Sequence, residues 1–196
     1  VPMLIYAGGA FEGTNATWGA IVIDPLSGAR LCFAGAVPEF VLTAWKDLVG
    51  EQLICQIEIY AVLCVHWKVR HLLHKRRLLL FIDNEPCRFV LIKGRSPSDP
   101  LFRMSHACAC IEASMPCYVW YERIASHSNP ADLPSRSRSG EACAKRSLEF
   151  VGDIALPSEL LAALVDGVPF PKITKPMETF TGSWSHGGKK EDDIDI

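Results

Sequence analysis

The chain has 196 residues, a length typical of one domain with a tail. Its composition, 49% hydrophobic and 21% charged, excludes a chain that is disordered throughout, because enough apolar side chains are present to form a core. The formal net charge of −2 does not by itself indicate a nucleic-acid partner, and no apolar run approaches the roughly 18 residues of a membrane-spanning helix.

The first forty residues predict three strands. The apolar run from Met3 to Ala7 ends in Gly8-Gly9, a pattern typical of a buried strand followed by a turn. Residues 17–24 (TWGAIVID) are rich in aromatic and β-branched side chains, turn residues follow at 25–28, and residues 30–37 predict a third strand. Because parallel neighbours need a long crossover, such short connections predict an antiparallel meander.

Helices and strands are expected to alternate over the next ninety residues. From about Gly50 to Arg70 apolar residues recur at helical spacing on most faces, which predicts a well-buried helix. The run RLLLFI at 77–82 predicts a central strand. Further expected elements are helices at 85–93 and 101–114, a fifth strand at 117–123, and a helical turn with Asn129 as N-cap and Pro130 in the first position. This order predicts an α/β fold, in which a five-stranded mixed sheet (an antiparallel meander, then parallel strands) has helices on both faces.

Three regions are expected along the chain: a domain over residues 1–136, a short helical extension over 137–168 with helices at 141–151 and 157–165, and a disordered tail over 169–196, where Pro, Gly, Ser and Lys dominate. The eight cysteines mostly lie in apolar segments, as reduced cysteines do, which favours an intracellular location, cytoplasmic or nuclear. A start within a strand, without an initiator Met, points to a fragment of a longer polyprotein.

Three acidic residues occupy positions that need an explanation. Asp83 ends the apolar run at 77–82, Glu58 lies within the apolar helix, and Asp132 lies at the head of the helical turn. Each alone would be taken for a structural or surface carboxylate, because an unpaired carboxylate in a core is costly. Together at one edge of the sheet they would form a site for Mg²⁺ or Mn²⁺, which take oxygen ligands.

The segments around these carboxylates resemble the RNase H-like domains of retroelement reverse transcriptases. They read QIEIYAVL around Glu58, LLLFIDNEPCRFVLIKG around Asp83 and WYERIASHSNPADLPSR around Asp132. The last is similar to the family's Asn-x-Ala-Asp-x-x-Ser-Arg signature, and the resemblance covers about residues 3 to 136. It implies that Glu58, Asp83 and Asp132 are catalytic metal ligands, and that the partners are an RNA–DNA hybrid and the rest of a reverse-transcriptase polyprotein.

One position departs from the family pattern. The carboxylate that the resemblance implies on the first strand aligns with Gly8, and that Asp normally bridges both metal ions, so its loss should cripple two-metal hydrolysis. Glu12 is close along the chain but lies beyond the expected strand end. His127, five residues before Asp132, lies in a shorter loop than the histidine of cellular RNase H enzymes and is interpreted as incidental.

If the centre works, the implied reaction is metal-dependent hydrolysis of RNA within an RNA–DNA hybrid. The hybrid would be recognised by shape, phosphates and 2′-hydroxyls. The basic cluster from Arg70 to Arg77 is equally well interpreted as a solvated helix end or as a phosphate contact. The candidate nucleic-acid-binding residues are Arg88, Lys93, Arg95, Arg76 and Arg77. Trp18, Trp45 and Trp67 are expected in the core rather than as stacking platforms.

The main alternative is a non-catalytic nucleic-acid-binding relic with the same fold. A nucleotide-binding loop at Gly8-Gly9 is disfavoured because a strand pattern, not a helix N-terminus, follows it. A serine hydrolase built on Ser126, His127 and Asp132 lacks a nucleophile elbow. A zinc site is disfavoured because its candidate ligands lack a Cys-x-x-Cys spacing; these are His106, Cys108, Cys110 and Cys117.

Overall fold

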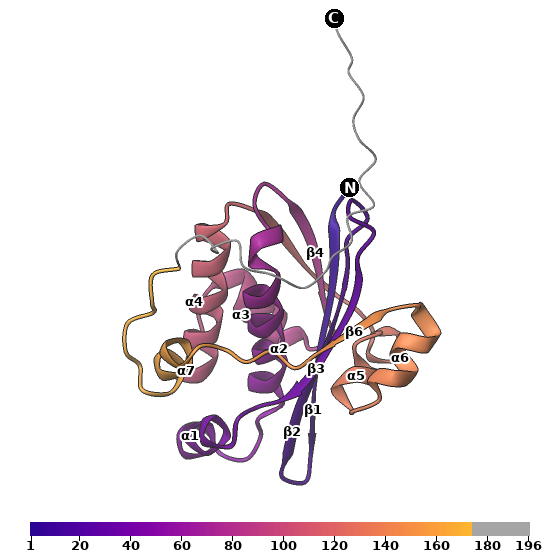
Figure 1. Cartoon of the computed structure of the whole chain (residues 1–196). Helices are drawn as coiled ribbons and strands as arrows, with labels where there is room; N and C mark the ends of the chain where they lie inside the picture. Colours follow the sequence, from indigo (N-terminus) through magenta and orange to yellow (C-terminus); the bar gives the residue numbers. More distant parts are fainter. Residues whose placement is uncertain (174–196) are drawn as a thin grey trace, which may run out of the picture.

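A computed structural model describes residues 1–173, and it contains one six-stranded mixed sheet in the order β5-β4-β1-β2-β3-β6 (Figure 1). The strands are β1 (Met3–Glu12), β2 (Asn15–Ile23), β3 (Arg30–Ala36), β4 (Arg77–Ile82), β5 (Tyr118–Arg123) and β6 (Glu149–Gly152). β1, β2 and β3 pair antiparallel, whereas β4 pairs parallel to both β1 and β5. The expected meander followed by parallel strands is therefore confirmed.

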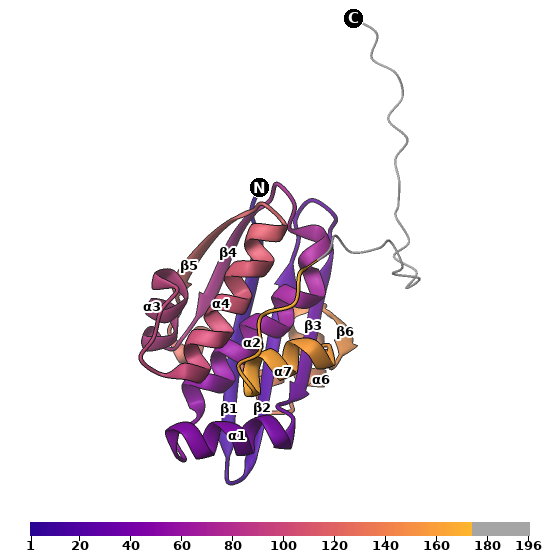
Figure 2. The ribbon, with the colours of Figure 1, turned by 90° about the vertical axis from the view of Figure 1, so that its left-hand side faces the viewer.

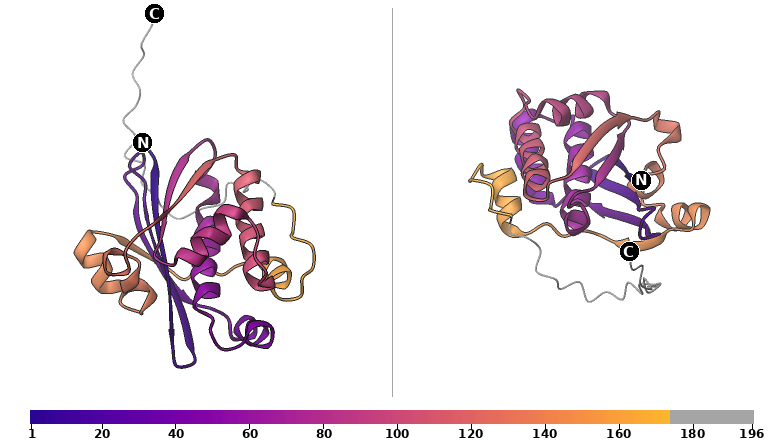
Figure 3. Two further views of the ribbon diagram at one scale, coloured as in Figure 1. Left: turned by 180° about the vertical axis from the view of Figure 1, so that it is seen from behind. Right: turned by 90° about the horizontal axis from the view of Figure 1, so that it is seen from above.

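Helices lie on both faces of the sheet, also as expected. One face carries α1 (Glu39–Val49), α2 (Ile54–Val69), α3 (Glu85–Lys93), α4 (Asp99–Ser114) and α7 (Ser158–Val165), as Figure 2 shows. The opposite face carries α5 (Asp132–Ser135) and α6 (Ser139–Arg146), which stand apart from the other helices when the molecule is seen from behind or from above (Figure 3). Two short 3-10 turns, at Arg70–Leu72 and Ser126–Ser128, complete the described elements.

The main core lies between the sheet and α2. Twelve of the sixteen residues of α2 are buried, so the helix has no solvent-facing stripe, which is the arrangement its apolar sequence predicts. Trp18 and Trp45 are fully buried as expected, and Trp67 packs at the edge of the core with the Arg70 guanidinium 3.9 Å from its ring centroid. A second, smaller core around Ile21 and Cys32 joins the other sheet face to α6.

The first strand is longer than the sequence analysis expects. β1 continues through Gly8-Gly9 to Glu12, paired throughout with β2, and the chain reverses at Gly13, whose φ is +64°. The turn was misplaced because Gly-Gly usually punctuates a chain. Here both glycines lie within the strand, and Gly9 permits close packing against α2, as described below.

The sheet has six strands rather than five. Residues 149–152, expected at the end of a helix, form β6, which pairs parallel with β3, and α6 ends earlier, at Arg146. Ser147 follows in the left-handed region, with φ +51°, and turns the chain toward the sheet edge. Helix α1 had no sequence expectation, although its Val41, Leu42 and Trp45 are buried at helical spacing.

The end of the expected tail, residues 174–196, lies outside the described residues. Among the residues that the structure does describe, no helix is both long enough and apolar enough to cross a bilayer.

Candidate functional site

Glycines 8 and 9 of β1 face opposite sides of the sheet, and Gly9 faces α2. A Cβ atom at Gly9 would lie 2.8 Å from Ile57 Cγ2 and 3.0 Å from the backbone nitrogen of Glu58, closer than real Cβ contacts allow. The missing side chain therefore lets α2 approach β1. This close approach brings the Glu58 carboxylate within hydrogen-bonding reach of the Gly9 backbone N–H.

Glu58 lies beside Asp83, at the carboxyl end of β4. Burial raises the pKa of Glu58 well above its usual range; the nearby Asp83 carboxylate also raises it, and the hydrogen bond from the Gly9 N–H only partly opposes this. Only 4% of Glu58 is exposed. Glu58 Oε2 and Asp83 Oδ1 are both buried without a hydrogen-bond partner among the described residues, an arrangement that native proteins seldom leave uncompensated.

Gly8 faces the other side of the sheet, toward the segment that precedes α5. A Cβ atom at this position would lie 3.5 Å from Asn129 Nδ2 and 3.6 Å from Ala131, which is ordinary van der Waals contact. Asn129 Nδ2 donates to the Ala7 carbonyl at 3.0 Å and its Oδ1 accepts from the Ala131 N–H at 3.0 Å. Position 8 thus has room for a side chain but provides no oxygen for a metal ion.

Asn129 is not the N-cap that the sequence predicts. Helix α5 begins three residues later, at Asp132, and no side chain caps it. The buried Asn129 instead fastens the chain to β1 through the hydrogen bond to Ala7. The two contacts use different atoms of the amide: Oδ1 accepts from the Ala131 N–H, the type of bond that an N-cap makes, although the regular helix begins only at Asp132.

Asp132 is paired with Arg136 and, among the described residues, forms no metal-holding group with the other two carboxylates. Its Oδ1 accepts from Arg136 Nε at 2.9 Å, and Arg136 Nη1 contacts Glu12 Oε1 at 2.8 Å, so the three side chains form a chain of ion pairs near the β1–β2 hairpin. Their side chains are 43%, 47% and 67% exposed for Asp132, Arg136 and Glu12. Glu12 therefore binds Arg136 and does not replace the carboxylate missing at Gly8.

The segment carrying Asp132 is held against β2. A Cβ atom at Gly19 would lie 2.4 Å from the Ser135 backbone nitrogen, so only glycine permits α5 to lie this close to the strand. Thr17 Oγ1 donates to the Ser135 carbonyl at 2.6 Å. These contacts position Asp132 on the sheet face that Gly8 also faces.

The described residues contain no group of three or more His, Cys, Asp or Glu side chains placed to hold a metal ion. This applies to the three carboxylates and equally to the disfavoured zinc ligands on and after α4. The donors present do not fit a two-metal centre, because Gly8 has no side chain and Asp132 is bound to Arg136. They do fit one hard cation, since Mg²⁺ is commonly held by one or two carboxylates and completes its shell with water. The two partnerless oxygens of Glu58 and Asp83 are the observation that favours it.

The candidate phosphate contacts fall at two ends of the sheet. Lys93 ends α3 and Arg95 follows it; both are exposed, and the length of α3 separates them from Asp83. Arg88 is paired with Glu85 at 2.9 and 3.0 Å. Arg77 is exposed at the start of β4, about 20 Å from Asp83 for a six-residue strand. Next to it, Arg76 Nη1 lies 3.3 Å from the buried Asp24 carboxylate and is engaged there. His127 is exposed in a 3-10 turn.

Sequence reasoning missed a pair of thiols beside the carboxylates. Cys55 and Cys87 lie at the starts of α2 and α3, where the Cys87 thiol contacts the Cys55 carbonyl at 3.3 Å and Asn84 Nδ2 approaches Cys55 Sγ at 3.6 Å. The hydrogen bond from the Cys87 thiol, against the effect of burial, lowers the pKa of Cys55 to about 6. No spacing rule links cysteines 32 residues apart, so their proximity could be seen only in the fold.

Neither a protein-family model nor a curated protein sequence matches this chain, but several solved structures match its fold. RNase H1 of the halophilic archaeon Halobacterium salinarum NRC-1 matches with a TM-score of 0.55 and 14% identity, over 72% of this chain and 99% of that one. The N-terminal RNase H domain of a Mycobacterium tuberculosis protein, solved as a fusion with maltose-binding protein, matches at 0.50 with 15% identity, over 74% and 98%.

A third match, LC11-RNase H1, was solved in complex with an RNA/DNA hybrid. Its TM-score is 0.51 with 15% identity, and the match covers 71% of this chain and 98% of that one. Identities this low show a shared fold and no more. On the element order, the sheet topology and these three matches, the chain has an RNase H-like fold.

Proposed function

We propose that this chain is a nucleic-acid-binding RNase H-like domain of a retroelement reverse-transcriptase polyprotein, with RNA–DNA hybrid as its partner and an incomplete hydrolytic centre. The observation on which the proposal depends is the geometry around position 8. The strand provides no carboxylate at Gly8, and the Asp132 carboxylate is paired with Arg136. Two-metal hydrolysis needs ligands that bridge both ions, and this arrangement does not supply them.

Hybrid as the partner is supported by the fold and by surface charge. A protein of the same fold, LC11-RNase H1, has been solved with an RNA/DNA hybrid. Lys93, at the end of α3, and Arg95, just after it, are exposed and so available to backbone phosphates. The retroelement setting is supported by the Asn-Pro-Ala-Asp-Leu-Pro-Ser-Arg string at 129–136. The eight free thiols support a reducing compartment, the cytoplasm or the nucleus.

Residual metal-dependent cleavage is the second candidate, favoured by the partnerless oxygens of Glu58 and Asp83. These two residues would hold one Mg²⁺ or Mn²⁺, which when bound supplies Lewis-acid activation of water and of a phosphoryl oxygen. The chain's own contribution is to hold both carboxylates in a largely buried position at the sheet edge. Glu58, whose pKa is raised, must release its proton before it can bind the cation.

The two candidates differ in a single assay on a fluorophore-labelled RNA–DNA hybrid with Mg²⁺ or Mn²⁺. We expect the wild-type chain to bind the hybrid without cleaving it. Gly8→Asp is a fair test of the missing ligand, since a Cβ atom there makes only ordinary contacts, and Gly8→Asn adds the same volume without the charge. Cleavage by the wild type that Glu58→Gln abolishes would favour the second candidate, and failure to bind hybrid at all would refute the first.

A restored centre also needs Asp132. Arg136→Gln would release Asp132 from its ion pair, so the double variant Gly8→Asp/Arg136→Gln should cleave more than Gly8→Asp alone. A matched control is Arg138→Gln, which removes an exposed arginine paired with Glu141 on α6. If the double variant cleaves no more than the wild type, the centre has lost more than its first carboxylate.

A further inference from the structure

Strand β5 is an edge strand that exposes two large rings. Tyr118 is 78% and Trp120 is 64% exposed, whereas the residues between and after them, Val119 and Tyr121, pack against the main core. Because side chains alternate along a strand, both exposed rings lie on the sheet face opposite α2 and α4. Single exposed hydrophobic residues are common, but two large rings two residues apart on one edge form a surface that calls for an explanation.

Among residues 1–173, no helix covers this face of the sheet around these rings. Helices α5 and α6 pack on β1, β2 and β3, which leaves the same face of β4 and β5 open, as the views in Figure 3 show. By register, Leu79 of β4 lies beside Trp120, and Phe81 follows two residues along. Phe81 stacks on Tyr6 of β1 with ring centroids 4.9 Å apart. The open face is thus an apolar and aromatic strip that runs toward the position of Gly8.

The Trp120 ring is held in place although it is exposed. Its Nε1 donates to Glu122 Oε2 at 3.1 Å. The Arg123 backbone N–H donates to the other oxygen at 2.8 Å, and these two hydrogen bonds lower the pKa of Glu122, so the acceptor stays ionised. An indole fixed in this way loses little conformational entropy when a flat partner stacks on it.

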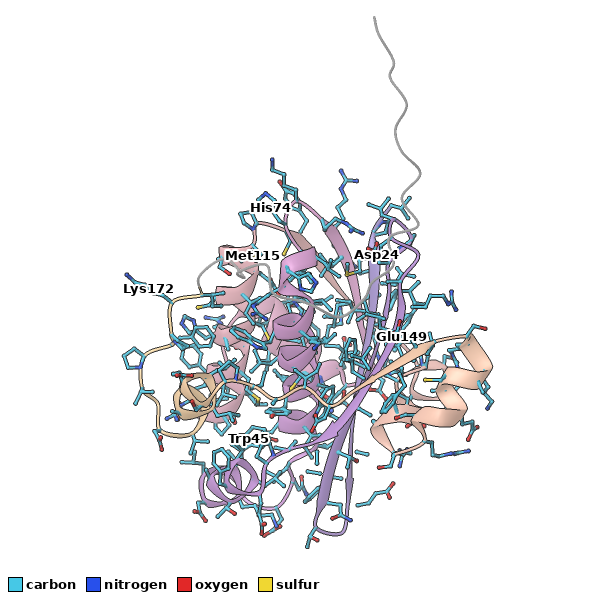
Figure 4. All side chains as sticks on the ribbon, viewed as in Figure 1. Asp24, Trp45, His74, Met115, Glu149 and Lys172 are labelled. Atoms are coloured by element: carbon cyan, nitrogen blue, oxygen red, sulfur yellow. The ribbon has the colours of Figure 1, made fainter. Side chains whose placement is uncertain are left out.

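Exposed cations lie at the start of this strip. Arg77 is the direct β4 neighbour of Tyr118, and His74 and Lys75 are exposed in the preceding turn. The turn is tied to the segment just before β5 by the hydrogen bond from the Lys75 N–H to the Pro116 carbonyl, at 2.7 Å. Figure 4 shows His74 at the same end of the molecule as Asp24, whose buried carboxylate is engaged by Arg76.

We propose that the open face of β4 and β5 binds single-stranded nucleic acid, with bases stacked on Tyr118 and Trp120 and phosphates held by Lys75 and Arg77. Rings two residues apart on one strand are about 6.6 Å apart, so each can take its own base. A duplex would not fit, because its bases are already stacked on one another. Aromatic rings beside a basic groove are the general chemistry of single-strand binding. The proposal shares the partner class of the proposed function but needs no metal and no cleavage.

The test measures the affinity of the full chain for fluorescein-labelled 12-mers of dT and of rU by fluorescence anisotropy. Trp120→Ala and Tyr118→Ala should each weaken binding about tenfold, which corresponds to about 1.4 kcal/mol. Trp120→Phe keeps a ring and should recover most of the loss. Phe150→Ala is the matched control, because Phe150 is a 54% exposed aromatic residue on β6, the opposite edge strand.

The phosphate contacts have their own measurement. For single strands the slope of log affinity against log salt is about −0.7 for each phosphate neutralised, so Arg77→Gln should make it less negative by about 0.7. Lys75 has φ +57°, and Lys75→Asn removes its charge while tolerating that backbone conformation. It should change the slope by a similar amount.

Binding of both 12-mers that is unchanged in Trp120→Ala and Tyr118→Ala, or that falls as much in Phe150→Ala, would overturn the proposal. So would light scattering that shows a wild-type dimer converted to monomer by Trp120→Ala without loss of 12-mer binding, because the face would then pair two copies. Circular dichroism confirms that each variant is folded. Hybrid binding measured in parallel separates the two proposals: loss of hybrid binding alone would refute only the proposed function.

Discussion

Adjacent glycines on β1 should respond in opposite ways to the same substitution. In Gly9→Ala the new methyl group would lie 2.8 Å from Ile57 Cγ2 and 3.0 Å from the Glu58 backbone nitrogen. Part of this contact is with helix backbone, which cannot move aside as a side-chain tip can. In Gly8→Ala the atoms nearest to the new methyl group lie at 3.5 and 3.6 Å, so neither the strand nor its neighbours need to move.

The expected magnitudes follow from these distances. Overpacking of a well-filled core typically costs about 1–3 kcal/mol, which applies to Gly9→Ala. Replacing a glycine by alanine without strain stabilises by about 0.4–1 kcal/mol, because the unfolded chain loses freedom, and this applies to Gly8→Ala. The free energies of unfolding should therefore differ by about 2 kcal/mol or more between the variants. For a chain of this size that difference corresponds to roughly 4–8 °C in Tm.

Thermal and urea unfolding of the two variants beside the wild type provides the assay. Gly9→Ala should unfold first and Gly8→Ala last, with equal urea m-values if all three proteins unfold in two states. Equal stabilities would refute the claim that β1 and α2 are packed too closely at Gly9 for any side chain. A reversed order would mean that position 8, not position 9, faces the helix.

Further predictions concern ionisable groups. The pKa of Glu58 is raised in the folded protein, so its contribution to stability is present below about pH 4.5, the unfolded value, and is lost as pH rises through the folded pKa. The free energy of unfolding should fall by up to about 1.4 kcal/mol per pH unit in that window. Urea unfolding of Glu58→Gln between pH 5 and 8 should no longer show this dependence on pH. An unchanged dependence would contradict the assignment to Glu58. Alkylation of Cys55 by iodoacetamide, followed by peptide mass spectrometry, should show a midpoint near pH 6 that rises in Cys87→Ala, whereas a midpoint unaffected by Cys87 would exclude the thiol hydrogen bond. Asp24→Ala leaves the Arg76 charge without its buried partner and should cost about 3 kcal/mol in urea unfolding; a loss below about 0.5 kcal/mol would place the pair among weak surface contacts.

Local patterns of the sequence were sufficient to predict much of the sheet. The run RLLLFI forms β4 with the expected bounds and lies between β1 and β5, but only the face with Leu78, Leu80 and Ile82 is buried, whereas Leu79 and Phe81 on the other face are half-buried. The apolar repeat of α2 and the short connections of the meander are equally local signals. The motif around Asp132 and the missing carboxylate at Gly8 were also visible in the sequence, and together they indicated the fold that the solved structures share.

Other features depended on contacts between distant segments. The Arg136 guanidinium lies between Asp132 and Glu12, which is 124 residues from Arg136 in the sequence, and no local pattern could have predicted that the motif Asp is paired in this way. Residues 149–152 became a strand because they pair with the edge of β3, although the sequence analysis expected most of them to continue the helix at 141–151. Trp120 is exposed because α5 and α6 pack on the other strands of the sheet and not on β5, which again only the fold shows. The carboxylates that could form the site were therefore evident in the sequence. Which of them lie together and which bind an arginine depends on residues far apart in the chain, and only the folded structure brings these into contact.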